Sequence, residues 1–246
     1  MAFGYAWDMS VPVILLHAFP YSPAMWKEQL WVVQGHPVLV PDILGFESLE
    51  SAAAHVLVEM DNRGWEKAVF VGLSMGGYVI FRLWNLEPER FAGLVLADTR
   101  ATSDTPEQKA ARAQMALRIR QEGTGFLPEA LLPGHLGGTT RTRNPALVEQ
   151  VRQTLLAVDP DKTIASLKGL AERPDSVPLL PDIAIPALIL VGEEDTLTPP
   201  ADARQMAVQI PDSRMLIIPQ AGHLANLENP KAFNTALLGF LWEIDH

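Results

Sequence analysis

One serine of this chain lies in a glycine-bounded motif between two segments of different periodicity. The motif is Gly72-Leu73-Ser74-Met75-Gly76, a G-x-S-x-G pattern. Residues 67–72 include a short apolar, β-branched run typical of a strand buried on both faces, and residues 76–86 have helical character. A serine between a strand and a helix has to occupy a very tight turn, where glycine two residues before and after it leaves room. The pattern predicts a strand, a sharp turn that exposes the Ser74 hydroxyl, and a helix.

The predicted turn gives Ser74 a chemical role. At a helix N-terminus, the backbone N–H of the next residue, Met75, and the positive end of the helix dipole can face a developing negative charge. The motif is short, so this interpretation needs an acid and a base elsewhere in the chain. Ser74 is the candidate nucleophile.

Two later strands end next to residues that can supply the acid and the base. Residues 186–192 read as a buried strand that runs directly into an acidic stretch ending at Asp195. Residues 214–218 read as a last strand, followed within a few residues by a glycine and His223. Open α/β sheets build their sites just past the carboxyl ends of their strands. Asp195 and His223 therefore become the candidate acid and base.

The acid has two competitors that the sequence leaves open. Glu194 directly precedes Asp195, and Asp98 ends the strand that follows the helix after the motif, from which it could also reach the histidine. The position of Asp195 favours it over both. Two other polar residues read as structural: His17 would shape the loop after the first strand, and Asp42 would hold its own turn.

Alternation of strands and helices along the chain predicts a mostly parallel sheet of about six main strands with helices on both faces. The expected strands lie near residues 11–16, 37–41, 67–72, 92–97, 186–192 and 214–218, and the expected helices between and after them lie near residues 23–33, 49–62, 76–86, 200–209 and 230–243. Between residues 101 and 180 no strand is expected, only helical pieces at 106–121, 127–132, 145–157 and 161–172. We therefore expect one α/β core, residues 1–100 and 181–246, with a helical insertion at 101–180.

These motifs together resemble the α/β-hydrolase fold family, in which the triad residues follow the chain order serine, acid, histidine. Residues 17–20, His-Ala-Phe-Pro, are similar to the family's H-G-F-P oxyanion loop, and residues 41–46 are similar to its P-D-x-x-G-x turn. The resemblance implies that the backbone N–H of Phe19 joins that of Met75 as the oxyanion hole. Segments 96–107 and 171–176 resemble a group of small esterases, cofactor-free haloperoxidase- or perhydrolase-like enzymes and 3-oxoadipate enol-lactonases.

The chain departs from the family pattern in its first part. Only ten residues precede Val11, so the family's N-terminal hairpin is expected to be mostly missing, and the stretch 45–67 is shorter than usual. Neither departure affects a triad position. The exposed first edge strand would need cover, which a partner subunit in a homo-oligomer could provide.

The resemblance implies that the helical insertion forms a cap over the active site. It holds ten lysine or arginine residues against nine acids, so it is basic relative to the rest of the chain, although solvated helix faces look the same. Side chains expected to line the substrate pocket, which could equally form the core of the cap, are Phe126, Leu127, Leu131, Leu132 and Leu136.

The composition limits the classes of protein to which this chain can belong. With 246 residues, 48% of them hydrophobic, the chain can bury one sizeable core, and it has no run near the ~18 apolar residues of a membrane helix. No secretion-like start is present, so a cytoplasmic location is expected. The absence of cysteine removes disulfides and thiol nucleophiles, and six scattered histidines give no zinc spacing. A net charge of −10 argues against nucleic acid as a partner.

The resemblance implies a serine hydrolase that needs neither metal nor organic cofactor and acts on a small ester or lactone. A serine at the turn argues against haloalkane dehalogenation, for which the family uses a carboxylate there. Three functions remain: a carboxylesterase for small acyl esters, a lactonase of the enol-lactonase type and a non-catalytic ligand receptor. The lactonase would need a cation facing the pocket to pair with a substrate carboxylate. The candidate cations are Arg118, Arg120, Arg141 and Arg143.

Overall fold

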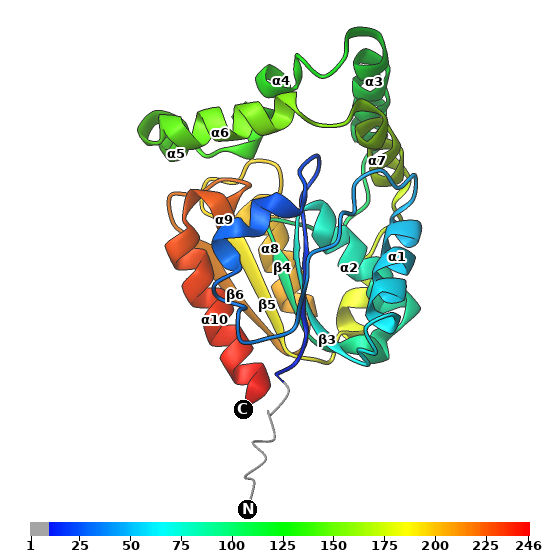
Figure 1. Cartoon of the computed structure of the whole chain (residues 1–246), viewed down its shortest axis with the longest axis vertical. Helices are drawn as coiled ribbons and strands as arrows, with labels where there is room; N and C mark the ends of the chain where they lie inside the picture. Colours follow the sequence, from blue (N-terminus) through cyan, green and yellow to red (C-terminus); the bar gives the residue numbers. More distant parts are fainter. Residues whose placement is uncertain (1–9) are drawn as a thin grey trace, which may run out of the picture.

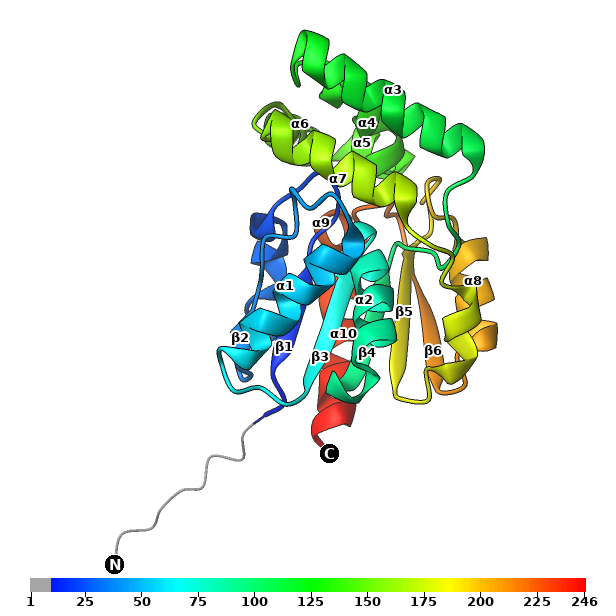
Figure 2. The same cartoon turned by 90° about the vertical axis from the view of Figure 1, so that its right-hand side faces the viewer.

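A computed structural model of the protein describes residues 10–246, and six parallel strands form one sheet in them (Figures 1 and 2). The strand order across the sheet is β2-β1-β3-β4-β5-β6. The strands are β1 (Val13–Leu16), β2 (Val38–Leu39), β3 (Ala68–Leu73), β4 (Phe91–Ala97), β5 (Ala187–Gly192) and β6 (Ser213–Ile218). The predicted six-stranded α/β sheet is confirmed. The expected loss of the N-terminal hairpin concerns residues 1–9, which lie outside the described residues.

The central strands are buried along their whole length, as their continuous apolar sequences predict. All residues of β1, β3 and β5 are buried, whereas β6 at the edge is exposed or half-buried up to Ile217 and buried only at Ile218. The other edge strand, β2, has two residues rather than the five expected. Cover of this edge by a partner subunit stays a prediction.

Successive residues of each strand point into two separate cores. Ile14 and Leu16 belong to the core under α1 (Leu49–Asp61), α2 (Met75–Leu86) and α8 (Pro200–Gln209). Val13 and Leu15 belong to the core on the opposite face. That face is covered by η1 (Pro23–Gln29) and α10 (Pro230–Asp245) (Figure 1).

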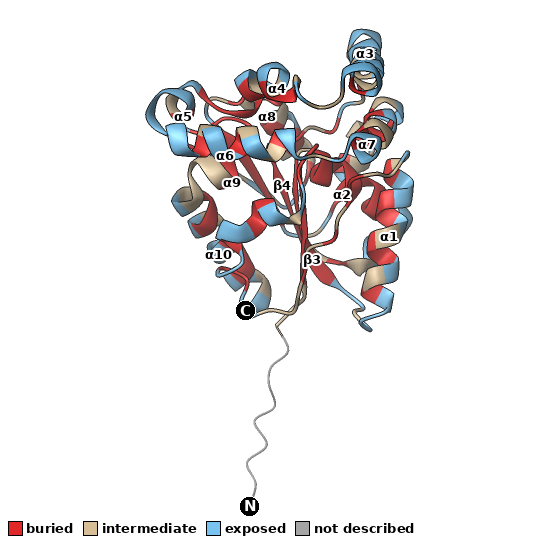
Figure 3. Ribbon diagram, turned by 45° about the horizontal axis from the view of Figure 1, so that its top comes forward, coloured by how far each residue is buried: buried red, intermediate tan, exposed pale blue. Residues whose placement is uncertain are grey.

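Five helices follow one another between β4 and β5 and lie across the carboxyl edge of the sheet (Figures 1 and 2). They are α3 (Pro106–Glu122), α4 (Leu127–His135), α5 (Gly138–Arg143), α6 (Pro145–Leu156) and α7 (Pro160–Glu172). Helix α3 packs on α7, and α4 packs on α6. Figure 3 shows that the buried residues of these helices lie on their inner faces. The short helix α5 and the extension of α4 to His135 were not predicted.

Short helical segments complete the chain. They are η2 (Pro88–Arg90), η3 (Val177–Asp182) and α9 (Ala225–Glu228). Within residues 10–246, no helix combines the length and the apolar character required to cross a membrane.

The register of the parallel strands brings their carboxyl ends to one edge. Gly72 of β3 pairs with Leu16 of β1 and with Leu96 of β4, and Gly192 pairs with Ile218. The segments that follow β1, β3, β4, β5 and β6 therefore emerge side by side beneath the five helices, and the candidate site residues lie in these segments.

Candidate active site

Ser74 lies at the N-cap of α2, directly after β3, in a strained backbone conformation. Its φ of 54° and ψ of −110° are in a region that residues other than glycine rarely adopt. The turn is also crowded: a Cβ on Gly72 would lie 2.5 Å from the carbonyl carbon of Gly76, and a Cβ on Gly76 would lie 2.1 Å from the carbonyl oxygen of Leu16. The two glycines of the motif are therefore required by close backbone contacts.

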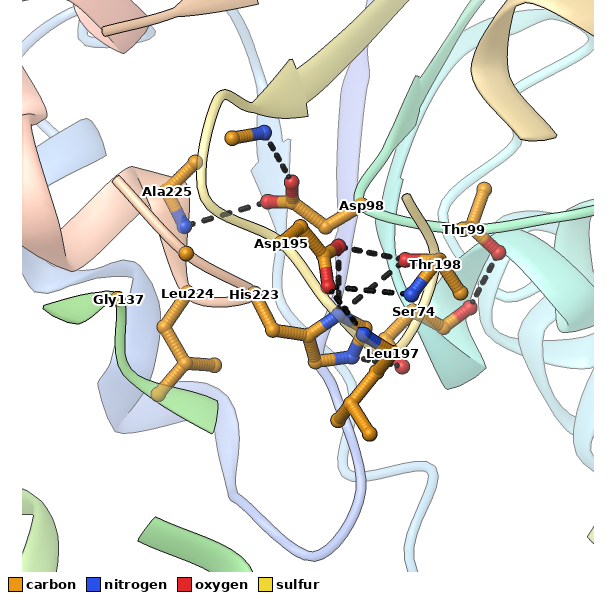
Figure 4. Close-up of polar contacts among 12 residues, drawn as sticks. Ser74, Asp98, Thr99, Gly137, Asp195, Leu197, Thr198, His223, Leu224 and Ala225 are labelled. Atoms are coloured by element: carbon orange, nitrogen blue, oxygen red, sulfur yellow. Dashed lines mark hydrogen bonds and ion pairs between the residues drawn. The ribbon is translucent and has the colours of Figure 1, made fainter. Parts of the chain in front are cut away.

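A chain of hydrogen bonds joins the three predicted catalytic residues (Figure 4). The Ser74 Oγ lies 2.8 Å from Nε2 of His223, and Nδ1 of His223 lies 2.9 Å from Oδ2 of Asp195. His223 and Asp195 are both buried. With the proton on Nδ1, the histidine donates to the carboxylate, and its Nε2 is free to accept the serine proton.

The loop after β5 holds the Asp195 carboxylate in place. Its Oδ1 accepts hydrogen bonds from the N–H of Leu197 at 2.8 Å and of Thr198 at 3.1 Å, and its Oδ2 accepts one from the Thr198 hydroxyl at 2.7 Å. Burial alone would raise the pKa of Asp195, but the His223 charge and the hydrogen bonds of His223 and Thr198 outweigh burial and lower it. The carboxylate therefore stays ionised beside the histidine.

The two competing acids have other partners. Asp98 is fully buried and accepts hydrogen bonds from the N–H of Gly192 at 2.7 Å and of Ala225 at 3.2 Å (Figure 4). Burial and the nearby Asp195 carboxylate raise the pKa of Asp98 well above its ordinary value. Glu194 instead accepts hydrogen bonds from the backbone N–H and the hydroxyl of Thr139, at 2.8 and 2.5 Å. Among the three acids, Asp195 alone contacts His223.

The backbone N–H groups of Phe19 and Met75 have no hydrogen-bond acceptor within residues 10–246, and both residues line the cavity at Ser74. The loop that carries Phe19 is shaped by His17, whose Nδ1 lies 3.0 Å from the carbonyl oxygen of Ala18 and whose Nε2 lies 2.9 Å from the backbone nitrogen of Ile43 and 3.2 Å from Oδ1 of Asp42. These contacts use both ring nitrogens in holding the backbone, which matches the structural role expected for His17.

Asp42 holds its own turn, as expected, by accepting the N–H of Leu44 at 3.0 Å. The hydrogen bond with His17 is the main cause that lowers the pKa of Asp42, and Lys162 of α7 adds to it at 2.8 Å. The turn is thereby also linked to the helices above the sheet.

A cavity of about 270 Å³ opens at Ser74 and His223, between the sheet and the helices above it. The other residues that line it are Phe19, Met75, Tyr78, Arg100, Gln108, Ala111, Arg112, Met115, Leu131, His135, Leu167, Leu170, Leu197 and Thr198. Its walls are mostly apolar, as small-molecule sites are, with a few polar groups that can fix a ligand.

Most of the side chains that the sequence suggested for the pocket lie elsewhere. Leu131 lines the cavity, but Leu127, Leu132 and Leu136 are buried in the core shared with α6, and Phe126 packs at its margin. The prediction is corrected for these four residues, because the apolar face of α4 packs mainly on α6.

The four arginines suggested as substrate cations do not line the cavity either. They are Arg118, Arg120, Arg141 and Arg143, and all four are exposed. The cations in the cavity wall are instead Arg100 and Arg112, which come from the segment after β4 and from α3. Arg100 lies in segment 96–107, which resembles the esterase and enol-lactonase group, but no role in the pocket was predicted for it, and no motif marked Arg112.

His135 is a further cavity residue without a sequence motif. It ends α4, is 4% exposed, and its ring centroid lies 5.9 Å from that of His223. Its Nδ1 lies 2.6 Å from the hydroxyl of the buried Tyr21. Because burial raises the pKa of Tyr21, the phenol stays protonated and donates a hydrogen bond to Nδ1. Burial, followed by the charge of His223, lowers the pKa of His135 to about 3. His135 is thus a neutral imidazole with its proton on Nε2.

Metal binding has no visible basis in this region. Within the part of the chain that the structure describes, no three histidine, aspartate or glutamate side chains are grouped as a metal site would require. The arrangement of a serine, a histidine, an aspartate and two unpaired N–H groups can perform acyl transfer by itself.

Comparisons with known proteins agree with this fold. Residues 13–236 match the model of the alpha/beta hydrolase family. The chain belongs to this family.

Three similar proteins are esterases or lactonases by name. A thermophilic esterase from Thermogutta terrifontis, whose structure was solved with malate bound, is 38% identical, with a TM-score of 0.93 over 97% of this chain and 92% of that chain. The enol-lactonase from Burkholderia xenovorans is 27% identical, with a TM-score of 0.86 over 95% and 92%. The 3-oxoadipate enol-lactonase 2 of Acinetobacter baylyi is 27% identical over 87% of this chain and 82% of its own length.

Replacing Asp195 by asparagine tests which acid orients the histidine. The amide would favour the wrong imidazole tautomer, so Asp195→Asn should lower kcat by roughly four orders of magnitude, as in comparable triads. Asp98→Asn is the matched control: it should cost about 1–3 kcal/mol of unfolding free energy through a poorly paired backbone donor, yet keep kcat within about tenfold. Ester hydrolysis and urea unfolding measure the two effects. A larger kcat loss for Asp98→Asn would transfer the role to that residue.

The lowered pKa of His135 predicts that the free energy of unfolding decreases in acid. Its pKa is about 3 in the folded protein against an ordinary value of 6.5, so below about pH 6.5 the unfolded chain binds a proton that the native protein excludes. Between about pH 7.5 and pH 5, the wild type should lose about 2 kcal/mol more unfolding free energy than His135→Gln. Urea unfolding at the two pH values measures this difference. Equal losses in the two proteins would show that His135 is not held neutral.

Proposed function

We propose that this protein is a serine hydrolase that cleaves small carboxylic esters through an acyl-enzyme intermediate. The observation that carries the proposal is the continuous hydrogen-bonded chain from Ser74 through His223 to Asp195 at the floor of the cavity. A non-catalytic receptor would not require this chain, nor the strained turn that presents the serine.

The proposed reaction follows from the positions of these groups. The Ser74 Oγ attacks the ester carbonyl carbon while Nε2 of His223 takes its proton, and Asp195 stabilises the imidazolium that forms. The N–H groups of Phe19 and Met75 bind the oxyanion, the second at the N-terminus of α2. His223 then protonates the leaving alkoxy oxygen, so that the alcohol departs and the acyl-enzyme remains.

Water completes the proposed cycle at the same residues. Nε2 of His223 removes a proton from a water molecule that attacks the acyl carbon, and the second tetrahedral intermediate collapses with return of the proton to the Ser74 Oγ. The products are a carboxylic acid and an alcohol. The five helices between β4 and β5 act as the cap in this proposal: their side chains shape the cavity and limit the size of the substrate.

A lactonase is the second candidate function. Lactone hydrolysis uses the same steps, with the alcohol remaining attached to the acyl product, and two of the similar proteins are named enol-lactonases. The esterase is more similar to this chain, at 38% against 27% identity, and this favours the open-chain ester. Parallel assays with p-nitrophenyl esters, simple lactones and an enol-lactone separate the two functions.

The proposal predicts that Ser74→Ala removes ester hydrolysis without unfolding the protein. Loss of a triad nucleophile costs about a million-fold in kcat in comparable enzymes. An organophosphonate should label the wild type at Ser74 and leave the variant unlabelled. Circular dichroism and thermal unfolding of the variant provide the folding control. Retention of more than a few per cent of the activity, or labelling of a different residue, would contradict the assignment.

A further inference from the structure

Three arginines converge on one buried carboxylate at the wall of the cavity. The carboxylate belongs to Asp104, in the segment between β4 and α3, and its side chain is fully buried. Oδ1 of Asp104 lies 3.0 Å from Nη2 of Arg100 and 2.8 Å from Nη1 of Arg173, and Oδ2 contacts Nε of Arg112. The cluster thus joins the segment after β4, helix α3 and the end of α7.

The cluster carries more positive charge than its acid can balance. Three guanidinium groups share one carboxylate, which leaves an excess of two positive charges. A further acid, Asp202, is affected by the charge of Arg100 but forms no ion pair with it in the described structure. Partly buried cations are costly unless an anion compensates them, and such charges are weakly screened by solvent.

Arg173, one of the three arginines, is engaged in contacts within the protein. Arg173 is 4% exposed, donates to the carbonyls of Leu170 and Thr102 at 2.9 and 3.1 Å, and stacks on the ring of Tyr78 at 4.1 Å. Its place is explained by binding Asp104 and fixing the end of α7. The surplus charge is therefore that of Arg100 and Arg112.

Arg100 and Arg112 both line the cavity and keep donors unused. Arg100 directs Nη2 to Asp104 and to Oε1 of Gln108, and Arg112 directs Nε and Nη2 to Asp104. The Nη1 of each arginine has no hydrogen-bond partner within residues 10–246, and neither atom is among the sealed, unpaired nitrogens of that part of the chain. Gln108 also accepts the N–H of Thr105 at 3.0 Å, so the position of Arg100 is held by the start of α3.

We propose that Arg100 and Arg112 form a binding site for a substrate carboxylate, so that the preferred substrates are short esters with a free carboxylate beyond the scissile ester. This proposal rests on the proposed ester hydrolysis and names its substrate class. The charged wall and the Ser74 hydroxyl belong to the same cavity, whose remaining walls include Met115, Leu167 and Leu197. The apolar walls suit a short methylene chain between the carboxylate and the ester carbonyl.

The first test compares two esters of nearly identical shape. Monoethyl glutarate carries a carboxylate, and ethyl glutaramate carries a neutral amide in its place. We expect a wild-type kcat/KM about tenfold to a hundredfold higher for the anion, mostly through KM. 4-Acetoxybutanoate and its amide repeat the comparison with the carboxylate on the alcohol side, and a preference for the anion in either pair supports the proposal.

Variants then assign the preference to residues. Arg100→Gln and Arg112→Gln should each lower the anion-to-amide ratio about tenfold while leaving kcat/KM for the amide within a few-fold. Arg118→Gln is the matched control, because Arg118 lies on the same helix as Arg112 but is exposed and outside the cavity. It should leave the ratio unchanged.

The outcomes of these experiments distinguish an error in the carboxylate site from an error in the proposed ester hydrolysis. Hydrolysis of the amide and the anion at equal rates by the wild type would overturn the carboxylate site and leave the esterase proposal standing. Hydrolysis of no ester at all would overturn the proposed function. If Arg112→Gln does not fold, Arg100→Gln decides, because Asp104 keeps two arginines there. An unchanged ratio in that variant would then exclude Arg100 from the site.

Discussion

The turn at Ser74 depends on backbone contacts that are too close for any side chain. The strand β1, the end of β3 and the first turn of α2 meet there, and a Cβ at Gly76 would overlap the carbonyl oxygen of Leu16. This approach forces the serine into its strained φ and ψ, at a cost of about 1–3 kcal/mol. The packing of β1 and β3, whose residues are all buried, offsets this cost.

The surroundings of Asp98 and Asp195 determine which of the two carboxyl groups contacts His223. Asp98 and Asp195 follow neighbouring strands, and the Asp195 carboxylate lies close enough to raise the pKa of Asp98. The two acids differ in what surrounds them. Asp98 is closed in by backbone N–H groups of the β5 end and of the loop after β6, whereas Asp195 faces His223. Asp98 thus links the end of β5 to the segment after β6, which carry Asp195 and His223, and these backbone contacts account for a buried carboxyl group that does not contact the histidine.

The sequence predicted those parts of the molecule that local patterns encode. Each main strand was recognisable because it is a short apolar run between turn residues, and Ser74, Asp195 and His223 each follow such a run. The cavity wall was not predictable in this way. His135, for example, lies in the cavity wall beside His223 and is hydrogen-bonded to Tyr21, which lies 114 positions earlier in the chain.

The same limit applies to the charged wall of the cavity. Counting arginines in the helical insertion pointed to four exposed residues, whereas the two in the wall are placed by a shared, buried Asp104. For a short amphipathic helix such as α4, the sequence gives the apolar face but not which neighbour covers it. Tertiary contacts alone determine whether such a face meets another helix or a substrate.

The cavity charge also shows why the overall charge of a protein is a poor guide to its ligands. The chain has a net charge of −10, which by itself disfavours anions. At physiological salt, however, charges more than about 8 Å away are largely screened, so the exposed acids of the surface have little effect inside the cavity. Arg100 and Arg112 are only 14% and 22% exposed and act at contact distance in a less polar medium. The excess of positive charge around Asp104 acts at shorter range than the acids of the surface, so the proposed carboxylate site is compatible with a negative net charge.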